Sequence, residues 1–429
     1  MSTDNKKPLQ SAEQLAKLLI IASVIGLISG LLVAVYLGLS NWGLAFFGTA
    51  PEGLQIIETV WPLILLVVGG LIVGASIRIL GEYFQLGSTQ RDFARNKGRL
   101  DYGRHLLITL FQCFVSLWCG SSVGPEGGLA EIGGGTGTLI YDKIKIKIDK
   151  VIFLTYCGVA GSFAGFFGNP IIGAFVGMEY LLIQGVPYVL LLIPGLAAAT
   201  FGYLVYSQLF PTSLAGTITF PTYAGATLLD LVWAFMIGLI AALFAHYHSW
   251  VISKFQALFS KLKDHPIQRG LIGGVTVGLI GSFIPLILYS GQTQLTTVLS
   301  QATIYSVAYL FLLVFGKSLV MALSFTSVFK GGPIFPFLFM GGVMGLAISQ
   351  LLPFVPEGVA VTGGMAAVMC GLFPIPLSIV IFIALMSQLN LVPTIVVATF
   401  TSFVFKRYLN SRLKHVEPAS NHSKSPTSP

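Results

Sequence analysis

Long apolar runs are the feature that most restricts what this chain can fold into. The first runs from Ala16 to Tyr36 and the second from Trp61 to Leu80, and each is long enough to cross about 30 Å of hydrocarbon as a helix. Hydrophobic residues make up 55% of the 429 residues and charged residues only 9%, which excludes a soluble globular protein. We therefore expect an all-α polytopic membrane protein embedded in a lipid bilayer.

Lysine and arginine gather in short loops between the apolar runs. One such loop follows Leu80, another spans Lys143–Lys150, and a third follows the run that ends at about Val251. The formal net charge of +8 is therefore explained by the positive-inside rule and does not indicate a nucleic-acid partner. The pattern predicts that these loops and both termini are cytoplasmic, in a plasma (inner) membrane.

The apolar runs from Leu106 to Tyr206 are short and interrupted, and those from Phe335 to Phe405 break up in the same way. Several cannot cross a bilayer alone, so we interpret them as half-helices that meet near its middle. The expected organisation is a cytoplasmic tail (1–15), a first membrane repeat (16–206), a linker (207–227), a second membrane repeat (228–405) and a disordered polar tail (406–429).

The two halves can be compared directly. Gly158 falls on Gly364 and Pro170 falls on Pro376, both at an offset of 206 residues. The same offset places the turn around Glu126 on Phe329–Pro333, and Gly135 on Gly341. Interrupted segments with Gly and Pro breaks at matching positions are typical of transporters built from two inverted-topology repeats, with the site between the repeats.

One of these breaks carries a carboxylate. In the turn Gly124-Pro-Glu-Gly-Gly128, Pro125 suits a first helical turn and Glu126 lies at the positive end of the helix dipole. Unpaired amides at such an end attract anions. Glu126 is therefore a candidate functional residue; the alternative is that it only caps a re-entrant helix.

These breaks resemble those of the CLC family of chloride channels and chloride/proton antiporters. The family has three glycine-rich turns, and similar segments occur here in the same order at Gly87-Ser88, Gly124–Gly128 and Gly331–Pro336. The Phe-Gly-Asn-Pro170 break followed by Glu179 is also similar to a family segment that ends in an acidic position. The resemblance covers residues 15–405 and implies two inverted repeats, a homodimer and a separate anion pathway in each subunit.

The resemblance also implies roles for single residues. Glu126 matches the family glutamate that occupies the outer anion site and acts as a gate. Ser88 would offer its hydroxyl to the central anion, and the main-chain amides of Ile334 and Phe335 would complete the anion site. Lys317 resembles the basic residue on the helix that enters the third turn.

Departures from the family pattern are concentrated in the same turns. Pro333 has no amide hydrogen, so one family ligand is lost; the adjacent Lys330 either compensates for it electrostatically or extends to the cytoplasmic interface. Tyr180, directly after Glu179, stands where proton-coupled members carry a second glutamate. Tyr408 is a positional candidate for the tyrosine that closes the inner side of the anion site.

The function expected from these residues is chloride transport gated by Glu126, as a voltage-gated-type channel or a weakly proton-coupled exchanger, with a halide and protons as the transported ions. A fluoride exporter and a tightly coupled chloride/proton antiporter are alternatives. An intramembrane hydrolase that uses Ser121 or Ser122 with His246 or His248 is an alternative of another class. The sequence predicts neither an organic cofactor nor a metal ion; chloride is the substrate.

Overall fold

The computed structural model describes residues 12–48, 50, 55–144, 151–181, 183, 187–210, 218, 220, 221, 223 and 225–414. These residues form α-helices and short 3₁₀ turns; the described residues include no strand, only an isolated bridge between Gly124 and Gly332. Seven of the described helices are long and apolar enough to cross a membrane, and four shorter apolar helices accompany them. The prediction of an all-α membrane protein is confirmed.

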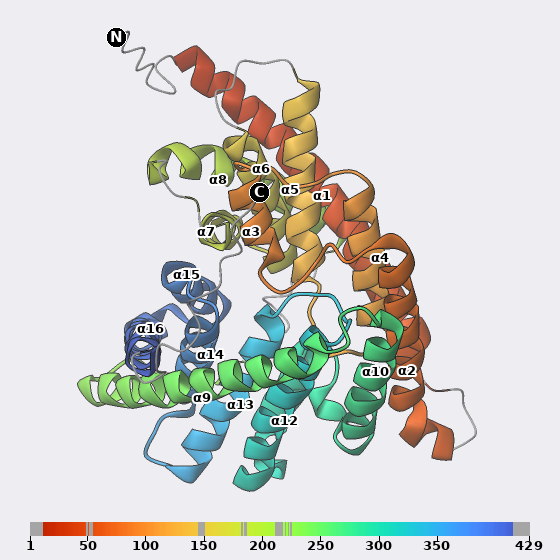
Figure 1. Ribbon diagram of the computed structural model, residues 1–429. Helices are drawn as coiled ribbons and strands as arrows, with labels where there is room; N and C mark the ends of the chain where they lie inside the picture. Colours follow the sequence, from red (N-terminus) through yellow and green to blue (C-terminus); the bar gives the residue numbers. More distant parts are fainter. Residues whose placement is uncertain are drawn as a thin grey trace.

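Each half contributes a series of helices. The first half comprises α1 (Ala12–Gly48), α2 (Gln55–Leu80), α3 (Ser88–Arg95), α4 (Arg104–Trp118), α5 (Glu126–Lys143), α6 (Ile152–Phe167), α7 (Pro170–Tyr180) and α8 (Tyr188–Leu209). The second half comprises α9 (Leu228–Ser260), α10 (Pro266–Phe283), α11 (Gln292–Ser300), α12 (Val307–Thr326), α13 (Ile334–Leu351), α14 (Glu357–Leu372), α15 (Pro376–Met386) and α16 (Val392–Lys414). In Figure 1 most of the first half lies in the upper part and most of the second half in the lower part, where α2 of the first half lies beside α10.

The halves correspond helix by helix, as expected for two repeats. Both α7 and α15 begin on a proline and both contain 11 residues, and their first residues differ by the expected 206. The preceding turns follow a different offset, because Glu126 begins α5 and Ile334 begins α13, a difference of 208. Gly124 and Pro125 therefore correspond to Gly332 and Pro333, and the expected match of Glu126 with the Phe329–Pro333 segment is two residues out.

Glycine contacts between helices confirm the corrected offset. A Cβ atom on Gly158 of α6 would meet the carbonyl oxygen of Gly133 on α5, and a Cβ on Gly364 of α14 would meet that of Gly341 on α13. Gly341 thus corresponds to Gly133 and not to Gly135. These positions require glycine, because the backbones of the paired helices are in direct contact and leave no room for a side chain.

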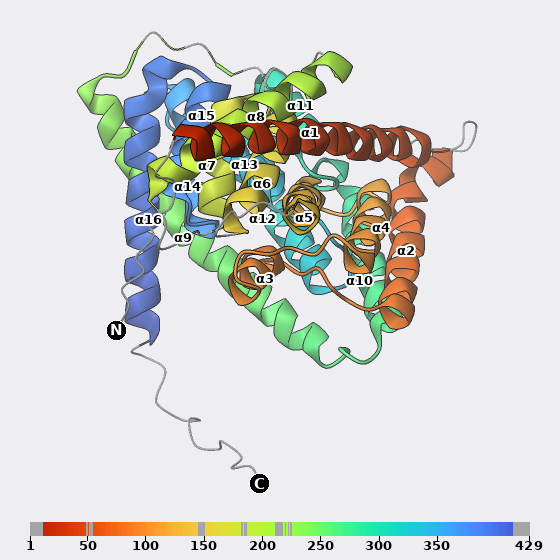
Figure 2. The same ribbon diagram turned by 90° about the horizontal axis from the view of Figure 1, so that it is seen from above.

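The two halves also contact each other through α7 and α15. One carboxylate oxygen of Glu179 accepts a 2.7 Å hydrogen bond from the amide of Ser378, and the Ser378 hydroxyl donates to the carbonyl of Phe175 at 2.9 Å. In addition α2 packs along α10, side by side in Figures 1 and 2. The core therefore runs across both halves, which fold as one unit.

The element boundaries differ from the expected ones at both ends. Helix α1 begins at Ala12, inside the expected N-terminal tail, and α16 continues to Lys414, well into the expected disordered tail. Likewise α8 extends to Leu209, into the expected linker. Residues 211–217, 219, 222 and 224 of that linker, the basic segment 145–150 and residues 415–429 lie outside the described part of the chain.

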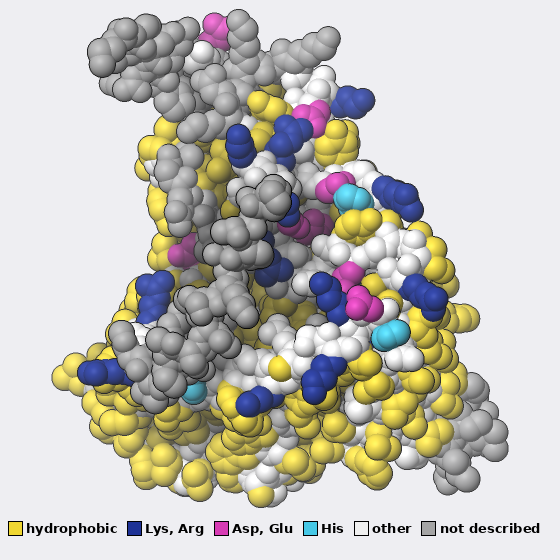
Figure 3. All heavy atoms as spheres, viewed as in Figure 1, with side chains coloured by type: hydrophobic (Ala, Val, Ile, Leu, Met, Phe, Trp, Pro, Cys, Tyr) yellow, Lys and Arg dark blue, Asp and Glu magenta, His cyan; other side chains and the backbone are white. Residues whose placement is uncertain are grey.

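Charged and apolar side chains occupy different parts of the face shown in Figure 3. Lys, Arg, Asp and Glu lie over its middle and upper parts, whereas the lower edge is almost wholly hydrophobic. Exposed apolar side chains such as Leu228, at 85% exposure, and Phe283, at 81%, would be unfavourable in water. The surface is therefore suited to lipid around its edge.

Candidate functional site

The glycine-rich turns of the two halves are joined directly by their backbones. The amide of Gly124 donates to the carbonyl of Gly332 at 2.7 Å, and the amide of Gly332 donates back to the carbonyl of Gly124. These two glycines are equivalent in the two repeats. The bridge therefore lies where the halves meet, and it brings the first turns of α5 and α13 to the same place.

Glu126 lies next to this bridge. Its carboxylate oxygen Oε1 accepts a 3.0 Å hydrogen bond from the amide of Phe335, at the N-terminus of α13. The side chain is only 1% exposed, and Oε2 has no hydrogen-bond partner in the described part of the chain. A Cβ on either bridge glycine would collide with this carboxylate. Glu126 thus occupies a narrow anion-binding site, here called the anion seat, which is formed by the Phe335 amide and the two bridge glycines. Its negative charge faces the positive end of a helix dipole.

Two cavities lie on either side of this seat. The Tyr180 cavity, of about 350 Å³, is lined by Glu126, Gly127, Gln90, Arg91, Tyr180, Ile334 and residues 372–375. The Tyr289 cavity, of about 120 Å³, is lined by Val123, Pro125, Phe166, Tyr289 and residues of α1. Pro125 and Glu126 are adjacent in the chain, so both cavities border the Glu126 turn.

The predicted anion ligands do not all reach this place. The Phe335 amide contacts Glu126, and Ile334 lines the Tyr180 cavity. Ser88 is not among the residues that line that cavity, and its hydroxyl accepts a hydrogen bond from the amide of Gln85 at 3.1 Å. Gly87, in the turn before α3, and Gln90, in the first turn of α3, line the cavity instead.

Lys317 is fully buried and lies away from the carboxylate. Its ammonium donates to the carbonyls of Ile287, Leu288 and Tyr289, at 3.1, 3.0 and 2.7 Å. It also lies 5.3 Å from the centre of the Phe339 ring. Lys317 therefore fixes the segment that carries Tyr289 to the edge of its cavity, and its amino group is satisfied by three carbonyl oxygens and an aromatic face.

Lys330 neither reaches the interface nor replaces the missing amide. It is 3% exposed and forms an ion pair with Glu82, which also pairs with Arg269 at 2.8 Å. Its own amide donates to the Ser116 hydroxyl at 2.9 Å. Burial by itself raises the pKa of Glu82, but the ion pairs with Lys330 and Arg269 outweigh it and lower that pKa. This buried triad fixes the residue that immediately precedes the Gly331-Gly332 turn.

The remaining candidates fall at three different places. Glu179 contributes to the contact between α7 and α15, whereas Tyr180 lines the Tyr180 cavity. Tyr408 is 50% exposed on α16, stacks on Phe405 and lies beneath the guanidinium of Arg412. It does not line either cavity, because the helix that carries it continues outward past the site.

Two functional candidates were not identified from the sequence. Glu82 was overlooked because its partners, Lys330 and Arg269, are distant in the chain. Glu131 lies one and a half helical turns after Glu126 and accepts a 2.6 Å hydrogen bond from the hydroxyl of Thr89. A second carboxylate within the same membrane helix was a signal that could have found it.

The hydrolase arrangement is not formed. The Ser121 hydroxyl donates to the carbonyl of Ser116 at 2.7 Å, and the amide of Ser122 donates to the hydroxyl of Ser324. His248 instead pairs through Nδ1 with Ser318 at 2.7 Å. In the described residues no histidine contacts either serine of the turn, so neither serine has a general base.

The fold and the site together define a class: a membrane protein in which two inverted halves bring helix N-termini and one carboxylate to a buried point. A family model described as voltage gated chloride channel matches residues 88–407. The match covers most of the chain, which belongs to this family, the CLC channels and antiporters.

Known relatives support the assignment. The chloride channel protein CLC-f of Arabidopsis thaliana is 28% identical over 407 residues, which cover 85% of this chain and 50% of the plant protein. This chain thus corresponds to about half the length of that relative. A chloride/fluoride channel protein of Pseudomonas syringae pv. tomato is 24% identical over 396 residues, covering 91% of this chain and 84% of that protein.

A solved structure confirms the fold. The crystal structure of a slow cyanobacterial Cl⁻/H⁺ antiporter matches with a TM-score of 0.78 at 20% identity, and the match covers 94% of this chain and 99% of the other. The two-repeat architecture expected from the sequence is therefore that of CLC transporters.

Proposed function

We propose that this protein moves chloride, or a similar halide, across a membrane through a pathway that Glu126 opens and closes. The observation that carries the proposal is the hydrogen bond from the Phe335 amide to the Glu126 carboxylate between two cavities. A carboxylate and a halide are both anions that fit amides at a helix N-terminus. Glu126 therefore occupies the seat of the transported ion and excludes the ion while it does so.

Two events would free the seat. Protonation removes the negative charge of Glu126 and with it the attraction to the Phe335 amide and the dipole of α13. A halide that enters from either cavity competes directly for the same donors. Both routes make transport depend on pH and on halide concentration, and neither requires a cofactor.

The test is chloride efflux from liposomes that contain the purified full chain. We expect efflux above that of protein-free liposomes, rising as the pH falls. Glu126→Gln mimics the protonated side chain, so its efflux should be at least as fast as that of the unaltered protein and nearly independent of pH. A matched control is Glu357→Gln, an exposed glutamate in the first turn of α14 that should preserve the pH dependence.

The outcomes separate the alternatives. An absence of chloride efflux at every pH would contradict the proposed transport. A Glu126→Gln protein that retains the full pH dependence would remove Glu126 from the gate and leave the transport itself intact.

Fluoride is the second candidate ion. The observation in its favour is the relative from Pseudomonas syringae pv. tomato, which is named a chloride/fluoride channel protein. The measurement is efflux of each ion in competition with the other. Fluoride efflux that chloride does not inhibit would reassign the selectivity without altering the role of Glu126.

We further propose a homodimer with one pathway in each subunit, cytoplasmic termini and a location in the plasma (inner) membrane. The support is membership of the CLC family and the apolar surface around the charged face in Figure 3. Light scattering in detergent should give twice the 45.9 kDa mass of the chain. A mass of one chain would contradict the dimer.

A further inference from the structure

A pocket of about 290 Å³ lies between basic segments of the two halves, and Glu126 does not line it. We call it the Arg269 pocket. Three cations line it from three different places: Arg91 from α3, Lys263 from the turn after α9, and Arg269 from α10. Among the described residues that line it, Glu82 is the only carboxylate. A hollow lined mainly by charges of one sign concentrates ions of the opposite sign, so this pocket is suited to an anion.

The ion pairs of the pocket leave part of its positive charge unmatched. Both carboxylate oxygens of Glu82 are engaged, because Oε1 pairs with Lys330 and Oε2 accepts a 2.8 Å hydrogen bond from Nη2 of Arg269. One carboxylate thus serves two buried cations. In the described part of the chain neither Arg91 nor Lys263 takes part in an ion pair. The Arg269 pocket therefore has more cations than carboxylates to neutralise them.

Arg269 also has an unused hydrogen-bond donor. The residue is only 6% exposed, and its Nε has no hydrogen-bond partner among the described residues. Buried donors without a partner are rare in native structures, because each one has lost its bonds to water. The flat guanidinium group presents its donors as a fork that matches two oxygens of one phosphate or carboxylate group. The unused donor therefore indicates an oxyanion as the missing partner.

The size and the wall of the Arg269 pocket favour a phosphate group over a halide. Its volume of about 290 Å³ is far larger than the ~30 Å³ that one water molecule takes up, so a single halide would fill little of it. Gln85 and Gln256 add uncharged polar groups to the wall, whereas Ile252, Phe259 and Phe325 form an apolar part. A phosphate monoester attached to an organic remainder matches a wall of both kinds.

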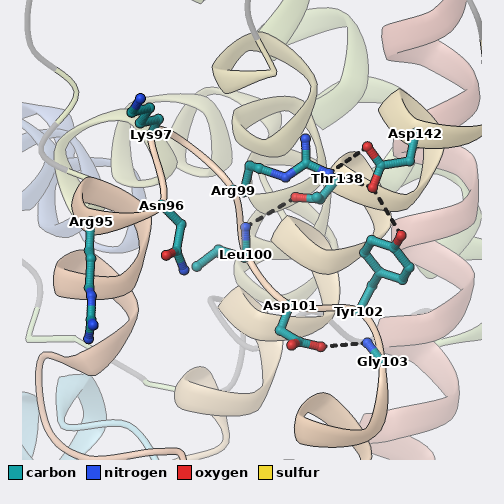
Figure 4. Close-up of a pocket in the computed structure, with 10 residues that line it drawn as sticks. All are labelled: Arg95, Asn96, Lys97, Arg99, Leu100, Asp101, Tyr102, Gly103, Thr138 and Asp142. Atoms are coloured by element: carbon teal, nitrogen blue, oxygen red, sulfur yellow. Dashed lines mark hydrogen bonds and ion pairs between the residues drawn. The ribbon is translucent and has the colours of Figure 1, made fainter.

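The larger pocket of Figure 4, of about 680 Å³, is also lined by basic residues but lacks these properties. Its Arg99 is paired with the carboxylate of Asp142, which also accepts a hydrogen bond from the Tyr102 hydroxyl. Among the described residues that line it, no buried polar side-chain atom lacks a partner. Arg99 therefore provides a matched control for the cations of the Arg269 pocket.

The Arg269 pocket adjoins the proposed ion pathway. Leu86 and Arg91 line both this pocket and the Tyr180 cavity, which Glu126 also lines. An anion bound beside Arg91 would neutralise that cation and repel a halide that approaches the cavity. An occupied pocket should therefore slow the passage of halide ions.

We propose that the Arg269 pocket binds a phosphate monoester group, carried by an anionic lipid or by a soluble molecule, and that the bound group inhibits anion transport. The inhibition rests on the proposed function, whereas the binding does not. Under the proposed orientation the basic segments around the pocket face the cytoplasm, so the ligand reaches it from that side.

The first experiment measures binding to the purified full chain in detergent by calorimetry. The probes are inorganic phosphate and dioctanoyl phosphatidic acid, and dioctanoyl phosphatidylglycerol is the diester control. A phosphate monoester carries a charge of about −1.5 to −2 at pH 7, so we expect phosphatidic acid to bind more tightly than phosphatidylglycerol. The double variant Arg91→Gln, Lys263→Gln should weaken binding about tenfold, and Arg99→Gln should not change it. Arg269→Lys keeps the charge but removes the fork, so it should also weaken binding.

The binding data also identify the source of the phosphate group. Phosphatidic acid that binds much more tightly than inorganic phosphate would identify a lipid ligand, and equal affinities would identify a soluble one. Binding of neither probe would overturn the proposal. Binding that the double variant leaves unchanged would overturn it as well, and this variant alters only exposed side chains, whose replacement should not disturb folding.

The second experiment measures chloride efflux from phosphatidylcholine liposomes that contain either phosphatidic acid or phosphatidylglycerol at the same surface charge. We expect efflux to be about tenfold slower with phosphatidic acid, the lower range by which a charged cleft alters encounter rates. Added inorganic phosphate tests the soluble source in the same liposomes. The double variant should lose most of the inhibition, relative to its own efflux without phosphate. Binding without inhibition would overturn the inhibitory role, whereas an absence of efflux in every liposome would contradict the proposed function and leave the binding result standing.

Discussion

At the scale of single residues, two buried lysines find polar partners by different means. Lys317 has no acidic partner among the described residues and relies on three carbonyl oxygens, while Lys330 relies on a carboxylate that it shares with Arg269. The first arrangement fixes a loop beside the Tyr289 cavity, and the second fixes the turn beside Glu126. Both lysines therefore act on the site indirectly, through the backbone that they position.

Replacing Lys317 by methionine tests the first arrangement. Methionine has a similar length, but the carbonyls of Ile287, Leu288 and Tyr289 would lose their shared donor. We expect a loss of about 1–3 kcal/mol in unfolding free energy, the usual cost of leaving a buried acceptor without its donor. Thermal unfolding in detergent measures it, and a variant as stable as the unaltered protein would show that these contacts contribute little.

Replacing Glu82 by glutamine tests the second arrangement, the carboxylate shared by Lys330 and Arg269. Lys330 would remain buried without its carboxylate, so a loss of about 3–5 kcal/mol is expected at pH 7. Because the pKa of Glu82 is lowered in the folded protein, its contribution is complete above the unfolded pKa and declines as the pH falls through the folded one. The stability difference between Glu82→Gln and the unaltered protein should therefore shrink under acid. A constant difference from pH 7 to pH 3 would contradict this account.

At the scale of elements, the N-termini of α5 and α13 define the site. Pro125 and Glu126 predicted the first of them from the sequence, because proline and an acidic residue favour a helix start. The bridge between Gly124 and Gly332 could not be predicted, since it joins backbone groups more than 200 residues apart and leaves no side-chain pattern. The anion-binding role of Ser88 was expected from the resemblance alone, and Gln90, two residues later, lines the cavity.

Gly332→Ala tests the element contact. The added methyl group would collide with the Glu126 carboxylate and displace it from the Phe335 amide. We expect chloride efflux that depends less on pH than that of the unaltered protein. Gly363→Ala is a suitable control, because its nearest neighbour would lie at an ordinary 3.5 Å. Normal pH dependence in Gly332→Ala would show that the carboxylate can move aside without leaving its seat.

At the scale of the whole molecule, the sequence was sufficient for the class and the two-repeat plan but not for all the boundaries. Matching glycines and prolines identified the repeats because close helix packing and helix starts each need one residue type. The start of α1 and the ends of α8 and α16 were misplaced, because polar residues continue these helices beyond the apolar runs on which the prediction depended.

The topology can be tested by cysteine labelling, because the four native cysteines are buried. A membrane-impermeant maleimide should label Gln301→Cys in intact cells, since the segment around α11 is expected outside. Lys261→Cys, in a basic loop, should react only after permeabilisation; both positions are exposed. Labelling of Lys261→Cys in intact cells would reverse the predicted orientation.

The paired turns also determine which part of this protein can move at low cost. A rocking motion of one half against the other would have to break both main-chain bonds between Gly124 and Gly332 in every cycle. Rotation of Glu126 about its own side-chain bonds breaks one bond to Phe335 and leaves the scaffold untouched. Under the proposed function, movement of the Glu126 side chain alone breaks fewer bonds than movement of one half against the other, so ions should pass without any rearrangement of the helices.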